Sequence, residues 1–185
     1  AWKLAPALVA GNTVVMKPAS LAPLSALRLV QALEQAGLPG GVVNYVTGSG
    51  GALGDAMLEH PSLKAISFTG SCDVGNRLYD KATRRRLRVQ LEMGGKNPTI
   101  VLADANPDFA AATLVNAAFY STGQKCTACS RAIVERAAYE PLVERLIART
   151  RALRIGNGLE AGIDIGPAVD ESQLNTDLEY IAIAQ

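Results

Sequence analysis

The sequence has 185 residues, of which 49% are hydrophobic and 19% charged. This composition is that of a globular α/β protein and excludes a mainly disordered chain, and the length allows one domain or parts of two. Eighteen basic and seventeen acidic residues leave a net charge of +1. The chain therefore lacks the surplus of basic residues that would predict a nucleic-acid or membrane partner. The longest uncharged stretch, residues 37–54, is interrupted by Pro39 and polar residues and does not predict a transmembrane helix.

The three cysteines are an odd number, which does not predict a disulfide framework and fits a reducing, cytoplasmic setting. The first residues show neither an initiator methionine nor the basic start and apolar middle of a signal peptide. We therefore expect a cytoplasmic protein and a chain that starts inside a longer polypeptide.

The first half of the sequence alternates short apolar runs with amphipathic segments, which is a β-α-β rhythm. Between Leu24 and Ala36 apolar residues return at helical spacing, and Gly37 and Pro39 supply the stop signals of a helix. Strands joined by such helices pair in parallel. The predicted elements are strands over 13–16, 42–46 and 65–68, and helices over 24–36, 52–59 and 74–83.

The second half continues the α/β pattern. Pro107, at the first turn of a long apolar segment, predicts a helix that runs to Tyr120. A glycine-rich loop ends near Pro167, and Asp170 opens a final helix. The other predicted elements are strands over 87–91, 99–102 and 132–134 and a helix over 139–153.

Two glycine-rich turns follow predicted strands, as in folds that bind phosphates at helix N-termini. In the turn over 47–54, Leu53 occupies the place of the third glycine of the Gly-x-Gly-x-x-Gly/Ala pattern and the glycine follows one residue later, so an ordinary strand-turn-helix connection remains the alternative. In the turn over 68–75, Ser71 could bind a phosphate or cap the next helix, and the spacing favours neither.

Cys126 lies in a loop between a long helix and a strand, next to Lys125. A nearby cation favours the thiolate of a nucleophilic cysteine, but a small structural residue fits the spacing equally well. Cys126 and Cys129 also form a lone C-x-x-C pair, which keeps a thiol oxidoreductase open as an alternative. His60 is the only histidine and is distant in sequence, so no metal site is predicted.

Glu92 stands at the end of a predicted strand and is followed by Gly94 and Gly95, which leave room around its carboxylate. The position suits a general base in partly apolar surroundings. A solvated loop acid is the alternative, and the spacing does not exclude it.

Five blocks of residues, taken together and in this order, resemble the aldehyde dehydrogenase superfamily. The resemblance extends over essentially all 185 residues and rests on several motifs at the family's usual separation. The blocks are residues 1–8 (AWKLAPAL), 11–18 (GNTVVMKP), 68–71 (FTGS), 91–96 (LEMGGK) and 123–127 (GQKCT).

The resemblance implies that Cys126 attacks a small-molecule aldehyde to form a thiohemiacetal, from which hydride leaves for a nicotinamide. It implies that Glu92 is the general base for the cysteine or for the water that hydrolyses the thioester. The backbone N–H of Cys126 would form half of the oxyanion hole. The family's other oxyanion donor, an asparagine, lies upstream of the first residue given.

The resemblance also implies NADP or NAD as the cofactor. Lys17 and Ser20 would meet the adenosine ribose, and Ser71 the pyrophosphate. Family members restricted to NAD+ commonly carry Glu where this chain has Ser20, so we expect NADP+ to be accepted. Lys3 matches a lysine near a proton-exit path. The other implied cofactor positions are Gly50, Gly54 and Val74 around the adenine, Gly70 beside Ser71, and Gly94 near the nicotinamide.

By the same resemblance, residues 1–94 are part of a Rossmann-like NAD(P)-binding domain and residues 95–185 the first part of an α/β catalytic domain. We expect an internal piece, inactive alone, of a homodimeric or homotetrameric enzyme. Residues 90–98, 121–127 and 164–167 look most like the α-ketoglutarate semialdehyde (2,5-dioxovalerate) dehydrogenases. A non-catalytic nucleotide-binding homologue and the thiol oxidoreductase remain the alternatives.

Overall fold

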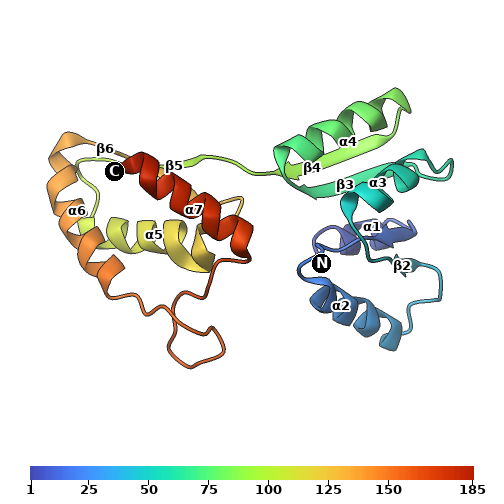
Figure 1. The fold of residues 1–185 in the computed structure, drawn as a ribbon, viewed down its shortest axis with the longest axis horizontal. Helices are drawn as coiled ribbons and strands as arrows, with labels where there is room; N and C mark the ends of the chain where they lie inside the picture. The colour runs from blue at the N-terminus through green and yellow to red at the C-terminus, as the bar shows by residue number, and fades with distance from the viewer. The chain divides into compact units, whose positions relative to one another are not determined.

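The computed structural model describes residues 1–185 and divides them into two compact units, Ala1–Glu92 (unit 1) and Met93–Gln185 (unit 2). The division falls two residues before the predicted domain boundary, so Gly94 belongs to the same unit as Cys126. Both units are built from strands alternating with helices, and the predicted α/β class is confirmed (Figure 1).

Unit 1 contains two two-stranded sheets, β1–β2 and β3–β4. Strands β1 and β2 pair in parallel, with Val14 opposite Val43, as the predicted crossover requires. The elements in chain order are α1 (Leu4–Val9), β1 (Val14–Met16), α2 (Pro23–Gln35), β2 (Val43–Tyr45), α3 (Gly50–Glu59), β3 (Ala65–Gly70), α4 (Cys72–Arg84) and β4 (Arg88–Met93).

Local sequence signals mark the helix ends of unit 1. Pro23 is the first residue of α2, and Gly37, at φ +88°, follows the end of this helix. Ser49 and Ser71 cap α3 and α4 by accepting hydrogen bonds from backbone N–H groups. The sequence did not predict α1, because its six residues are too few to display a helical period.

The core of unit 1 is small. Leu4, Leu58 and Ala82 are its buried hydrophobic residues. Helices α3 and α4 are also joined by an ion pair, in which Lys81 Nζ lies 2.7 Å from Asp55 Oδ1. The hydrogen bond from Lys81 lowers the pKa of Asp55, but both side chains remain half-exposed, so the pair adds little stability.

Unit 2 packs two helices against a parallel pair of strands. Its elements are β5 (Asn97–Val101), α5 (Pro107–Phe119), the 3₁₀ turn η1 (Tyr120–Gly123), β6 (Cys129–Val134), α6 (Arg136–Arg151) and α7 (Glu171–Ala184). Strand β5 pairs with β6, and Ile100 lies opposite Ile133. The buried cluster of this unit consists of Val101, Ala111, Leu114, Ala138 and Leu142.

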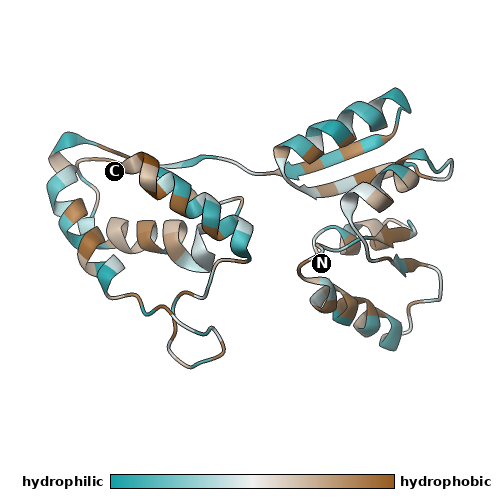
Figure 2. Cartoon of the chain, in the orientation of Figure 1, coloured by the Kyte–Doolittle hydropathy of each residue, from teal (hydrophilic) through white to brown (hydrophobic).

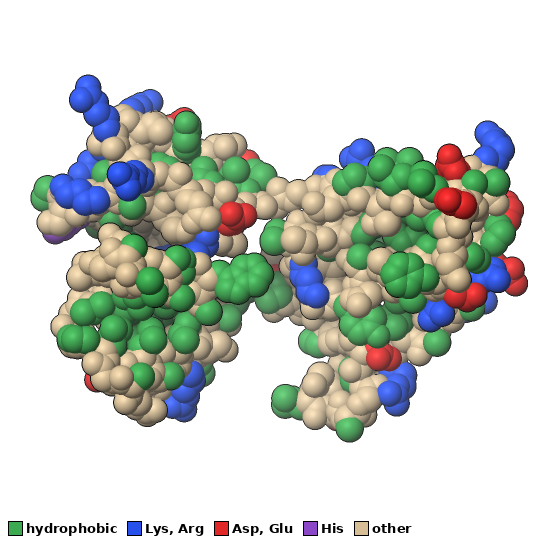
Figure 3. Space-filling view, turned by 180° about the vertical axis from the view of Figure 1, so that it is seen from behind, with side chains coloured by type: hydrophobic (Ala, Val, Ile, Leu, Met, Phe, Trp, Pro, Cys, Tyr) green, Lys and Arg blue, Asp and Glu red, His purple; other side chains and the backbone are tan.

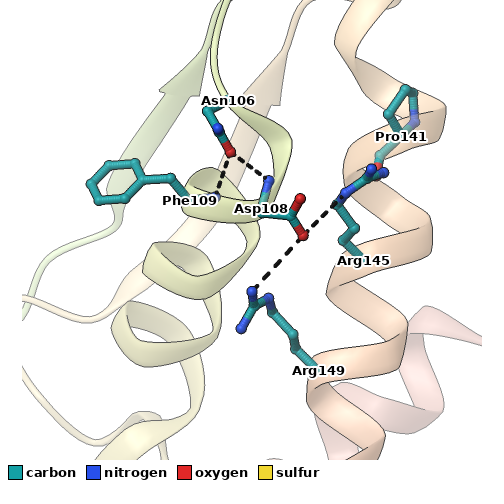
Figure 4. Close-up of polar contacts among 6 residues, drawn as sticks. All are labelled: Asn106, Asp108, Phe109, Pro141, Arg145 and Arg149. Atoms are coloured by element: carbon teal, nitrogen blue, oxygen red, sulfur yellow. Dashed lines mark hydrogen bonds and ion pairs between the residues drawn. The ribbon is translucent and has the colours of Figure 1, made fainter.

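Polar contacts complete the packing of α5 against α6 (Figure 4). Asn106 caps α5, because its Oδ1 accepts hydrogen bonds from the backbone N–H groups of Asp108 and Phe109 at 3.0 Å each. The Asp108 carboxylate lies 3.2 Å from Nε of Arg145 and 3.9 Å from an Nη of Arg149, both on α6.

Two boundaries in unit 2 differ from the prediction by three residues. Strand β6 starts at Cys129, three residues before the predicted start, because pairing with β5 extends it through polar residues that carry no apolar signal. Helix α6 starts at Arg136 and contains Pro141 in its second turn, whereas the prediction started it at Tyr139.

The two units differ in surface character. Unit 1 carries ten basic and six acidic residues, and unit 2 carries eight basic and eleven acidic residues. Figure 3 shows Lys and Arg side chains gathered on the part of unit 1 that bears α4, and mixed with Asp and Glu on unit 2. None of the helices is both long enough and apolar enough to cross a membrane.

Candidate active site

Cys126 lies at the corner of a tight turn that leads into β6. The turn is closed by a hydrogen bond of 3.0 Å from the backbone N–H of Ala128 to the carbonyl oxygen of Lys125, which makes Cys126 and Thr127 its central residues. The Cys126 side chain is an exposed free thiol. A thiol at such a corner can be approached by a substrate, as a nucleophile requires.

Cys129, the other half of the C-x-x-C pair, has different surroundings. It is half-buried at the start of β6 and packs against the core of unit 2. Its Sγ accepts a hydrogen bond from Thr99 Oγ1 at 3.1 Å and lies 3.3 Å from the carbonyl oxygen of Arg131. These contacts are those of a structural cysteine.

The segment before the Cys126 turn has an unusual backbone. Ser121 and Thr122 both have φ of 55°, and Gly123 has φ of 67°. The Thr122 hydroxyl lies 2.5 Å from the side-chain oxygen of Gln124, which also accepts a hydrogen bond from the backbone N–H of Val169. Side-chain contacts therefore hold the segment that leads into the Cys126 turn.

Glu92 is part of β4 and not of a loop. Polar and apolar side chains alternate along this strand, and Glu92 and Gln90 share its exposed face (Figure 2). Nε2 of Gln90 donates to the Glu92 carboxylate at 3.2 Å. Within unit 1 the carboxylate is thus exposed and has a polar neighbour, and the partly apolar surroundings expected from the sequence are absent there.

Two further residues extend this contact into a chain of hydrogen bonds across unit 1. The Ser67 hydroxyl on β3 donates to Gln90 Oε1 at 2.5 Å, and Lys3 Nζ donates to the same hydroxyl at 3.2 Å. The direction of donation therefore runs from an ammonium group to a carboxylate. The sequence did not predict the roles of Ser67 and Gln90, although their places on strands beside Glu92 could have suggested them.

All the expected cofactor residues except Gly94 belong to unit 1, where they lie at the end of β3, in the loop after β1 and on or beside the helices that follow β2 and β3. Lys17 and Ser20 follow β1; Lys17 is half-buried and donates to the Pro18 carbonyl at 2.6 Å, and Ser20 is exposed. Gly50 and Gly54 stand one helical turn apart on α3, and a Cβ at either position would meet nothing within 4 Å. One face of α3 therefore has room for a flat ligand close to the backbone.

The turn from β3 to α4 shows the capping role that the sequence left open for Ser71. Its Oγ accepts a hydrogen bond from the Val74 N–H at 3.3 Å, which leaves its own hydroxyl proton available to a phosphate. The Val74 side chain is 39% exposed. Packing explains why residue 70 is a glycine, because a Cβ there would overlap the Phe68 ring. Gly94 has open space around its α-carbon.

These features fit a dinucleotide. Helices α3 and α4 both start at the carboxyl end of a strand, where unpaired backbone N–H groups attract phosphates. Hydroxyl groups at both N-caps and the open face of α3 supply polar and flat contacts. No group of three or more His, Cys, Asp or Glu side chains is placed to hold a metal ion.

Comparison with known proteins identifies the family. The sequence matches the aldehyde dehydrogenase family over residues 1–185. The chain belongs to this family. It is 50% identical, over its whole length, to the α-ketoglutarate semialdehyde dehydrogenase of Haloferax volcanii, and 47% identical over 97% of its length to the α-ketoglutaric semialdehyde dehydrogenase of Bacillus subtilis. The predicted resemblance is confirmed.

Solved structures of similar proteins share the fold. The betaine aldehyde dehydrogenase of Staphylococcus aureus in complex with NAD+ matches 99% of this chain with a TM-score of 0.94 at 34% identity. An NADP-dependent enzyme of E. coli matches 96% with a TM-score of 0.93 at 41% identity. The chain spans 38% and 37% of the two curated relatives and 36% and 37% of these two structures.

Proposed function

We propose that the protein to which these residues belong oxidises an aldehyde to a carboxylic acid with NAD(P)+, through covalent chemistry at Cys126. The observation that carries the proposal is the exposed thiol at the corner of the 125–128 turn, within the motif that resembles the family's nucleophile block. Membership of the aldehyde dehydrogenase family supports it.

In the proposed reaction the Cys126 thiolate adds to the aldehyde carbon, and the backbone N–H of Cys126 donates a hydrogen bond to the oxyanion that forms. The dinucleotide, when bound, supplies the hydride acceptor that converts this thiohemiacetal to a thioester. Glu92 then removes a proton from the water that attacks the thioester, and the carboxylic acid leaves as Cys126 is regenerated.

The dinucleotide would be held by residues of unit 1 and by Gly94. Lys17 and Ser20 would bind the adenosine ribose, and Ser71 a phosphate oxygen through its free hydroxyl proton. The adenine would lie on the open α3 face at Gly50 and Gly54, near Val74. The absence of a carboxylate at Ser20 leaves space for a 2′-phosphate, so both NAD+ and NADP+ are proposed as cofactors.

For the substrate we propose a short semialdehyde that carries a carboxylate, such as α-ketoglutarate semialdehyde. The support is the identity of 50% and 47% to relatives with that printed activity. Identities of 43–44% to proteins named 1-pyrroline-5-carboxylate dehydrogenase make the semialdehyde of glutamate the next compound to assay.

Separate replacement of Cys126 and of Cys129 in the full-length protein tests the function. Cys126→Ala is expected to abolish aldehyde oxidation and to leave NAD(P)+ binding largely unchanged, because the nucleophile is lost and the dinucleotide residues are untouched. Cys129→Ser is the matched control and should keep activity. Turnover by Cys126→Ala would overturn the proposal.

The same pair of variants tests the rival function. A C-x-x-C oxidoreductase would form a reversible Cys126–Cys129 disulfide, lose its function in Cys129→Ser and keep it after loss of Glu92. A wild-type protein without dehydrogenase activity towards a panel of semialdehydes, but with NAD(P)+ binding, would instead indicate a non-catalytic nucleotide-binding homologue.

A further inference from the structure

One side chain connects the first residue of β5 to the turn that carries Cys126. Nδ2 of Asn97 donates hydrogen bonds to the carbonyl oxygen of Cys126 at 2.7 Å and to that of Ala128 at 3.2 Å. A carboxamide nitrogen has two hydrogens, so both are used on this one turn. The turn's own hydrogen bond uses the carbonyl of Lys125, and Asn97 therefore holds two other carbonyl groups of the same four residues.

The backbone explains why a side-chain donor is placed here. Pro98, the next residue of β5, has no N–H to donate. The pairing of β5 with β6 is irregular at this point, since Asn97 lies opposite Cys129 whereas Pro98 lies opposite Arg131. The strand ladder is thus irregular where the turn enters β6, and the Asn97 carboxamide supplies hydrogen bonds there.

Contacts to these two carbonyls restrict the nucleophile itself. Peptide groups are planar, so fixing the oxygen of a peptide unit fixes the orientation of the whole unit. The Cys126 carbonyl belongs to the unit that follows the Cys126 α-carbon, and the Ala128 carbonyl anchors the other end of the turn. Together they limit the rotation that would swing the Cα–Cβ bond of Cys126 away from its direction.

We propose that Asn97 is a positioning residue that keeps Cys126 Sγ in the orientation needed for attack on the aldehyde carbon. The inference rests on the proposed function of Cys126. Misplacement of a reacting group by about 1 Å can slow a reaction by about 100-fold, so a contact that only orients the turn can control the rate.

Asn106 provides a matched control for a purely structural effect. It is an asparagine of the same unit, and its side chain also makes two hydrogen bonds to the backbone. These bonds cap α5 and do not involve the Cys126 turn. Loss of either asparagine removes two hydrogen bonds, but only one loss affects the nucleophile.

The experiment compares Asn97→Ala, Asn97→Asp, Asn97→Ser and Asn106→Ala in the full-length protein. Three quantities are measured for each: the rate of the first-turnover burst with a semialdehyde and NAD(P)+, the rate of Cys126 alkylation by iodoacetamide with Cys129 as the internal reference, and the Tm. Asn97→Asp keeps the size of the side chain and removes both donors, whereas Asn97→Ser keeps one donor.

We expect the burst rate to fall about tenfold or more in Asn97→Ala and Asn97→Asp, and by less in Asn97→Ser. Alkylation of Cys126 should change far less, because a small reagent needs no fixed orientation of the thiol. Asn106→Ala should lower the Tm and leave both rates unchanged.

Two results would overturn the role of Asn97: a burst in Asn97→Asp as fast as in Asn106→Ala, or a burst and an alkylation rate that fall together, which would mean that Asn97 acts on the reactivity of the thiol and not on its orientation. A wild-type protein that forms no NAD(P)H with any semialdehyde would instead contradict the proposed function.

Discussion

Unit 1 and unit 2 differ in how they hold their candidate functional residues. In unit 2 the Cys126 turn is closed by its own backbone bond, anchored by Asn97 and set on a sheet that packs on a five-residue core. In unit 1 Glu92 lies on an exposed strand face, and two of the expected cofactor residues, Gly50 and Gly54, lie on an open face of α3. The group proposed to form a covalent bond is thus fixed by its own unit, whereas Glu92 and the two glycines of α3 have open space beside them.

This difference has an energetic consequence. Within residues 1–185, unit 1 buries three hydrophobic side chains and unit 2 has a connected cluster of five, so a bound ligand would contribute a larger share of the stability of unit 1. We expect dinucleotide binding to stabilise unit 1 more than unit 2.

The largest effect that would test this division of roles is on Glu92. Glu92→Gln should leave the first-turnover burst intact and slow steady-state turnover by about 100-fold or more, since an amide cannot accept the proton of the attacking water. Stopped-flow detection of NAD(P)H separates the two phases. Glu34→Gln, on the exposed surface of α2, is the control for loss of one negative charge, and an unchanged steady-state rate in Glu92→Gln would remove Glu92 from the mechanism.

The next largest effect is on the free energy of unfolding when a leucine in the core of either unit is replaced. Leu142→Ala should lower the free energy of unfolding by about 2–5 kcal/mol, because the side chain is buried within the cluster of unit 2 and leaves a cavity. Leu58→Ala in unit 1 should cost less, since Leu58 is equally buried but outside any such cluster. Denaturant titration of the full-length protein measures both, and an equal or greater loss in Leu58→Ala would contradict the contrast between the units.

The smallest effect is on the choice of cofactor. Ser20→Glu should raise the KM for NADP+ over that for NAD+ by about tenfold or more, which corresponds to a like-charge contact of about 1.4 kcal/mol with the 2′-phosphate. Ser25→Glu adds the same charge to the exposed surface of α2 and serves as the control. A wild-type preference for NAD+ together with an unchanged ratio in Ser20→Glu would show that Ser20 does not meet the 2′-phosphate.

Much of the fold follows from local signals in the sequence. Pro107, Gly37 and Asp170 mark helix ends within one residue of where the structure has them, because each acts through its own backbone or a cap a few residues away. The start of β6 could not be predicted from its own residues, since Cys129, Ser130 and Arg131 join the strand only by pairing with β5.

The residues of the candidate site also fall into those that the sequence predicts and those that only the structure shows. The motifs that resemble the family single out Cys126 and Glu92, but the residues that contact them are found only in the fold. Asn97 reaches carbonyl groups 29 and 31 residues away, and Lys3 reaches Ser67 across 64 residues. No spacing rule connects residues at such separations, because tertiary packing alone brings them together.

The left-handed residues before the Cys126 turn bear on how this loop tolerates substitution. In this conformation a residue such as Thr122 lowers the stability of the folded chain by about 1–2 kcal/mol relative to glycine. Glycine at the same place would lower it by about 0.5–1 kcal/mol for a different reason, because glycine gives the unfolded chain more conformational freedom. The two effects oppose each other, so backbone energetics provide only weak selection for either residue. A threonine retained at this position across divergent sequences would therefore be retained for its hydroxyl, which meets Gln124 and through it the backbone at Val169.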